Sequence, residues 1–131
     1  MTIMKTRKRT GIRRKSVGQE PHPSVVEALK RSIREELFCS QGKFPEVACK
    51  NDFYMALAYA VRDRLLHRWI HSAHTYFQKE SRTVVYLSME YLLGPQLGNN
   101  LINLGIYDEA AEAVKDFGYS LDELLEQEEE P

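Results

Sequence analysis

The chain has 131 residues, of which 43% are hydrophobic, so it is large enough to bury one core. Its formal net charge is only −1, so the overall charge predicts neither an acidic nor a basic binding partner. No apolar run approaches the roughly 20 residues that span a bilayer, and the basic start lacks the apolar core of a signal peptide. We therefore expect a cytoplasmic protein without a membrane-spanning segment.

The first fifteen residues carry seven basic side chains and no acid, whereas the last quarter of the chain is acidic. With its glycines and prolines, the beginning of the chain is typical of a basic flexible arm over residues 1–23. The arm lacks aromatic residues that could stack on bases, which favours a solvated or regulatory tail over nucleic acid binding. Ser16 follows Arg13-Arg14-Lys15 and resembles a basic-directed phosphorylation site.

A first helix is predicted to begin at Ser24, where Ser24 and Glu27 have the spacing of a capping box. Apolar residues then recur at steps of three and four, and the helix should end near Cys39. Cys39 and Cys49 lack the spacing of a zinc site, so both are interpreted as free thiols. The apolar stripe consists of Val26, Leu29, Ile33 and Leu37.

A second, longer helix is predicted over residues 52–79, capped by Asn51 and Asp52. Its apolar face is wide, which predicts burial on more than one side. The histidines at positions 67, 71 and 74 could share a face, but no HExxH pattern accompanies them, so we favour a helix surface over a metal site.

Residues 83–88 (Thr-Val-Val-Tyr-Leu-Ser) are rich in β-branched and aromatic side chains and predict a buried strand. A single strand needs partners for its backbone, and no other strand is evident, so we expect a fragment of a larger fold. Glu90 follows this strand directly, at the edge of a sheet where α/β folds keep their sites. Its alternative role is that of a capping or surface glutamate.

Three short helices are predicted to complete the chain. Pro95 suits the first turn of one that ends at Gly105, a second spans residues 108–117 and ends at Gly118, and a capping box at Ser120 and Glu123 begins the last. The buried face of the first of these is predicted to be Leu97, Leu101 and Leu104.

Four sequence blocks resemble the start of the α-glucan (glycogen or starch) phosphorylases. They read DFYMALAYAVRDRL at 52–65, RWI at 68–70, VYLSMEYLLG at 85–94 and LGNNLINLG at 97–105. The bacterial type is indicated by QGKFP at 41–45 and by Asn99-Asn100. The resemblance implies an α-rich α/β fold, in which residues 24–131 form the truncated N-terminal part of a two-domain, GT-B-like glycosyltransferase with an incomplete sheet.

The resemblance also implies an activity. Enzymes of this family use inorganic phosphate to cleave terminal α-1,4-linked glucose from an α-glucan, releasing glucose 1-phosphate with pyridoxal phosphate as cofactor. The cofactor lysine, the phosphate-binding residues and the catalytic histidine belong to family segments beyond Pro131. The attachment lysine is therefore expected to be absent here, no catalytic residue is assigned, and the isolated chain is expected to be inactive.

Single positions can be carried over from the family. Glu90 matches a glutamate at the edge of the active site, and Trp69 lies on the helix that binds effectors in animal relatives. Ala73, His74 and Phe77 replace the polar and tyrosine contacts of those relatives, which argues against activation by a nucleotide. The loop over residues 40–50 matches a segment that reaches the second subunit, which implies a homodimer at full length.

Three alternatives remain open from the sequence. The chain could instead be a non-catalytic helical interaction module derived from a phosphorylase N-terminus. The truncation could be natural or could reflect an incomplete record. The glucan could be glycogen, starch or maltodextrin.

Overall fold

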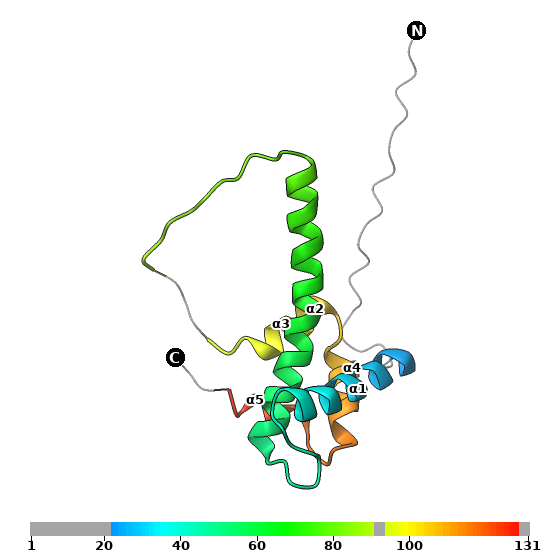
Figure 1. Ribbon diagram of the computed structural model, residues 1–131. Helices are drawn as coiled ribbons and strands as arrows, with labels where there is room; N and C mark the ends of the chain where they lie inside the picture. The colour runs from blue at the N-terminus through cyan, green and yellow to red at the C-terminus, as the bar shows by residue number, and fades with distance from the viewer. Residues whose placement is uncertain (1–21, 91–93, 129–131) are drawn as a thin grey trace.

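The computed structural model describes residues 22–90 and 94–128, which form five helices (Figure 1). The residues of the predicted basic arm up to position 21, Ser16 among them, lie outside this range. The helices are α1 (Pro23–Cys39), α2 (Lys50–Gln78), α3 (Leu97–Leu104), α4 (Tyr107–Lys115) and α5 (Leu121–Leu125). The chain is therefore helical wherever it has regular structure in the described range.

One core forms where the first half of α2 packs against α1, α3 and α5, and where α4 covers α1 (Figure 1). Small side chains at Ala56 and Ala60 line the buried side of α2 and let the neighbouring helices approach closely. Phe53 closes one end of the core, with its ring centroid 5.2 Å from the rings of both Phe117 and Tyr119. The predicted stripe of α1 (Val26, Leu29, Ile33, Leu37) is confirmed as buried.

The short helices largely follow the predictions. Leu97, Leu101 and Leu104 are buried, and α3 ends at Gly105, whose φ of +71° is the left-handed conformation that glycine adopts without strain. The capping box of α5 is confirmed, because Ser120 N–H donates to Glu123 (2.8 Å) and Glu123 N–H donates to the Ser120 hydroxyl (3.2 Å).

The capping box predicted for α1 is wrong. The helix begins at Pro23, one residue before the predicted cap, because proline has a φ suited to the first helical position and needs no N–H partner there. The Ser24 hydroxyl instead lies 2.9 Å from His22 Nδ1, and Glu27 accepts from Lys30 at 2.9 Å. His22 N–H, at the start of the helix, donates to buried Glu109 of α4 over 3.4 Å.

The start of α2 is fixed by an ion pair that spans the preceding loop. Cys49 precedes the helix, and its N–H donates to Asp52 at 2.8 Å, so Asp52 caps from inside the helix and the predicted cap Asn51 does not. Lys43 Nζ lies 2.8 and 2.7 Å from the two carboxylate oxygens of Asp52. The N–H of Lys43 donates to the carbonyl of Leu37 at 3.0 Å. Lys43 therefore ties the end of α1 to the start of α2.

Residues 83–88, predicted as a buried strand, form no strand in the described part of the chain, which contains none. Residues 81–90 are extended and exposed, with Val84 92% and Leu87 90% accessible. A strand requires a neighbour for its backbone groups, and none runs beside this segment in the described range. The burial predicted along the whole of α2 is likewise wrong, since its second half projects beyond the core (Figure 1).

The ion pair at the start of α2 predicts a specific response to acid. Lys43, followed by the Cys49 N–H, lowers the pKa of Asp52 from its ordinary 3.8 to about 2. A lowered folded-state pKa contributes stability that is complete above about pH 4 and is lost as the pH falls towards 2. We expect Asp52→Asn to unfold at lower urea concentration at pH 7 and to show a flatter dependence of stability on pH between 4 and 2.

Urea denaturation followed by circular dichroism over this pH range measures both effects. Asp63→Asn is the matched control, because it removes an exposed carboxylate of the same helix and should leave the curve close to that of the wild type. Parallel curves for Asp52→Asn and the wild type would contradict the prediction.

Candidate functional site

Glu90 lies at the end of the extended segment that leaves α2. The chain turns off the helix at Glu80, which has a left-handed φ of +48°, while Ser81 N–H donates to the Tyr76 carbonyl at 3.2 Å. A non-glycine residue pays about 1–2 kcal/mol for this conformation. The direction in which the segment leaves α2 is therefore imposed by a strained residue.

A local turn shapes the backbone at Glu90. The Ser88 hydroxyl donates to the Glu90 carbonyl at 2.8 Å and accepts from the Glu90 N–H at 3.1 Å. The Glu90 side chain is exposed. An exposed carboxylate needs further groups around it to form a site that excludes water, so Glu90 alone does not form such a site in the described part of the chain.

Trp69 belongs to an apolar stripe on the second half of α2, which we call the outer stripe. Its members recur at steps of three and four residues and so share one face of the helix. Trp69 is 67% and Phe77 83% accessible, although the pattern is that of a buried face. The outer stripe consists of Leu66, Trp69, Ile70, Ala73, Tyr76 and Phe77.

The opposite face of the same half-helix carries Arg64 and Arg68, and the sequence has no acid between positions 63 and 80. The three histidines considered for a metal site, His67, His71 and His74, lie exposed on this face. Within residues 22–90 and 94–128, no group of three or more metal-ligating side chains comes together. The histidines thus form a polar surface in the described structure.

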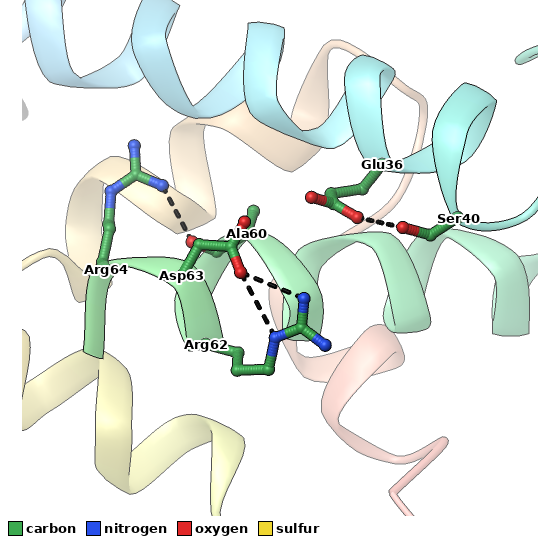
Figure 2. Close-up of polar contacts among 6 residues, drawn as sticks. All are labelled: Glu36, Ser40, Ala60, Arg62, Asp63 and Arg64. Atoms are coloured by element: carbon green, nitrogen blue, oxygen red, sulfur yellow. Dashed lines mark hydrogen bonds and ion pairs between the residues drawn. The ribbon is translucent and has the colours of Figure 1, made fainter. Parts of the chain in front are cut away.

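Arginine side chains mark the boundary between the buried and exposed halves of α2. Arg64 Nη1 donates to the Ala60 carbonyl at 3.1 Å, and Arg62 donates twice to Asp63, at 3.0 and 3.2 Å (Figure 2). Burial lowers the pKa of Arg64, and the charge of Asp63 partly offsets this. One turn further along, Arg68 Nη2 donates to the Leu104 carbonyl at the end of α3, 3.4 Å away. The first two contacts lie within α2, and the Arg68 bond to Leu104 joins α2 to α3.

The loop between α1 and α2 presents a second small apolar surface. Phe44 and Val47 are more than half exposed on it. At its start, the Ser40 hydroxyl donates to Glu36 of α1 (Figure 2). The first part of the loop that the resemblance relates to a second subunit is thus tied to α1 by Ser40 and to α2 by Lys43.

Three of the described lysines are paired with acidic side chains. A Schiff-base lysine requires a lowered pKa, whereas the pKa of Lys30 is raised by Asp116 and Glu27, and that of Lys43 by Asp52. Lys115 is paired with Glu112 at 2.8 Å on the surface of α4.

None of the described helices combines the length and apolarity needed to cross a membrane.

Comparison with known proteins gives the following relatives. The glycogen phosphorylase of Synechocystis sp. is 59% identical over 106 residues, which are 81% of this chain and 12% of that protein. The glycogen phosphorylase of Pasteurella multocida is 40% identical over 107 residues (82% of this chain, 13% of that protein). The liver form of human glycogen phosphorylase is 40% identical over 105 residues (80% and 12%).

The chain therefore spans about an eighth of the length of the curated relatives that it matches. No protein-family model matches it. The resemblance to phosphorylases predicted from the sequence blocks is confirmed, as is its bacterial character, by the 59% identity to a cyanobacterial relative.

The position of the outer stripe outside the core can be tested by substitution. Trp69→Gln combined with Phe77→Ser should change the free energy of unfolding by less than about 0.5 kcal/mol, as at other exposed positions. Leu57→Ala, in the buried half of the same helix, should lower it by about 2–5 kcal/mol. Urea denaturation monitored by circular dichroism measures both. A loss above about 1 kcal/mol in the double variant would mean that the stripe is packed, since exposed positions rarely cost that much.

Proposed function

We propose that this chain, which is homologous to glycogen phosphorylases over about four fifths of its length, is the N-terminal segment of an α-glucan phosphorylase. The observation that carries the proposal is the 59% identity over 106 residues to a phosphorylase. The parent reaction is phosphorolysis of terminal α-1,4-glucosidic bonds to glucose 1-phosphate. The isolated chain is inactive, because the resemblance places the cofactor lysine, the phosphate-binding residues and the catalytic histidine in family segments outside it, and these groups supply the stabilisation of the transition state.

The exposed apolar surfaces of the chain support a larger parent fold. The outer stripe and residues 83–88 have the patterns of a buried helix face and a buried strand, yet both are accessible. Covering them requires a sheet to which residues 83–88 contribute one strand. We therefore assign residues 24–131 to the N-terminal domain of a GT-B-like enzyme, which follows a basic arm at residues 1–23.

In this parent enzyme, Glu90 lies at the edge of the active site and contacts substrate or the water around it. Pyridoxal phosphate is held by a lysine outside this chain, and inorganic phosphate and an α-glucan are the substrates. The enzyme is a cytoplasmic homodimer, with the loop over residues 40–50 at the subunit contact. Exposed Phe44 and Val47 on that loop support this assignment.

Two places are candidates for regulation. Trp69 marks the helix that corresponds to the effector-binding helix of animal relatives, but Ala73, His74 and Phe77 argue against a nucleotide as its effector. Phosphorylation of Ser16 would change the charge of the arm. A second candidate function is a non-catalytic helical interaction module, which the exposed outer stripe favours, since unpartnered apolar faces mark interaction sites.

The proposal is tested by grafting. Residues 24–131 replace the matching segment of the Synechocystis glycogen phosphorylase, and glucose 1-phosphate released from glycogen and phosphate is measured. We expect the chimera to be active and the isolated 131-residue chain to be inactive. Glu90→Ala in the chimera should lower kcat by at least about tenfold, as displaced active-site contacts do, whereas Glu112→Ala, on the surface of α4, should not.

Two results would contradict the proposal. A chimera that folds and binds its cofactor but releases no glucose 1-phosphate would overturn the assigned function. Glucose 1-phosphate released by the isolated chain would overturn its proposed inactivity.

A further inference from the structure

The extended segment that carries Glu90 must return to the bundle at the start of α3, and this return is held from a distant part of the sequence. Gln96 N–H donates to Glu128 Oε1 at 2.5 Å, and Leu97 N–H donates to Oε2 of the same carboxylate at 3.1 Å. A carboxylate paired with two N–H groups at a helix N-terminus forms charge-assisted bonds, which are stronger than neutral ones. The tie joins residues about thirty positions apart in sequence.

The backbone of Glu128 lies in a hydrogen-bonded turn that follows α5. Its N–H donates to the Leu125 carbonyl at 3.1 Å, and Gln127 N–H donates to the carbonyl of buried Leu124 at 3.0 Å. The turn that follows α5 is therefore ordered, and Glu128 projects from it. Because the backbone of Glu128 is already ordered, little further conformational entropy is lost when its carboxylate binds a partner. Such a carboxylate can hold that partner in a defined position.

A second contact joins the same two helix ends. A Cβ atom on Gly98 would lie 3.4 Å from Leu125 Cδ1, an ordinary van der Waals distance, so Leu125 of α5 lies close to the backbone of α3 at this position. The Glu128 bonds and the Leu125 contact together form what we call the α3–α5 clamp. Because Gln96 also donates to the Gly94 carbonyl at 2.9 Å, the clamp extends to the chain just before α3.

We propose that Glu128 is a positioning residue for Glu90. At its other end, the Glu90 segment leaves α2 at strained Glu80, and its described residues 81–90 are exposed. The clamp therefore sets where the segment re-enters the bundle, only six residues after Glu90. This inference rests on the proposed function, in which Glu90 belongs to the active site. It adds the residue that holds the start of α3, where the chain after Glu90 re-enters the helical bundle.

The first test uses the 131-residue chain and needs no activity. Hydrogen exchange at the amides of Gln96 and Leu97 should accelerate by about tenfold or more in Glu128→Ala, since a charge-assisted bond is lost at each. Glu128→Gln keeps an acceptor oxygen and should give an intermediate rate. Glu126→Ala removes an exposed carboxylate from the same turn and should exchange like the wild type.

The second test uses the grafted phosphorylase. Glu128→Ala should lower kcat severalfold, leave KM for glycogen within about twofold, and leave the melting temperature of the enzyme unchanged, because a displaced catalytic geometry lowers turnover more than ground-state binding. Glu128→Gln should recover part of kcat, and Glu126→Ala should match the parent chimera.

Each outcome decides the matter. Unchanged exchange in Glu128→Ala would show that the clamp does not hold α3 and would overturn the inference. Faster exchange with unchanged kcat would make the clamp purely structural, which also overturns it. A parent chimera that is inactive from the start would overturn the proposed function and the positioning role with it, while the exchange rates would still report whether the clamp exists.

Discussion

The burial of the first half of α2 is the constraint on which the other helices depend. This half-helix contacts α1, α3 and α5, and α4 reaches the same core through α1. Its buried positions alternate a large ring at Phe53 with small residues at Ala56 and Ala60, so the partner helices fit closely around it. Burial of these apolar side chains supplies the main driving force for the bundle. The outer stripe on the second half of α2 has the same apolar periodicity, but its side chains are exposed in the described range.

A second constraint is that the first N–H groups of each helix have no acceptor within the helix. Acidic side chains supply acceptors for several of these groups. Glu109 accepts from the residue before α1, Asp52 from the residue before α2, Glu128 from the start of α3 and Glu123 from the residue before α5. A carboxylate at such a position satisfies a donor and also interacts favourably with the helix dipole. The acidic last quarter of the chain, which appears in the sequence as a block of like charge, thus has a structural use: three of these four caps come from it.

The sequence predicts the helices well because local periodicity determines them. The buried faces of α1 and α3, the stop at Gly105 and the capping box at Ser120 all depend on residues within one or two turns of each other. The caps at α1 and α3 could not be predicted, because their partners lie 87 and about thirty residues away and nothing in a run of glutamates indicates which one reaches a helix start. The false cap at Ser24 has a local origin instead, since Pro23, one residue earlier, begins the helix. Of the candidate site, Glu90 and Trp69 could be named from the sequence, but Glu128 could not.

A hydrophobic pattern predicts that a surface is buried, but it does not identify the element that covers it. The predictions for residues 83–88 and for the second half of α2 failed for this one reason: both segments have buried-type patterns, and the described chain offers neither a neighbouring strand nor a facing helix. The two surfaces are consecutive, joined at Glu80, so a single sheet packed on the outer stripe would cover both and pair the strand at once. Glu90 would then stand at the edge of that sheet. Its position would then be constrained from both directions along the chain, by the completed strand before it and by the start of α3 after it. An active-site role for Glu90 depends on both constraints.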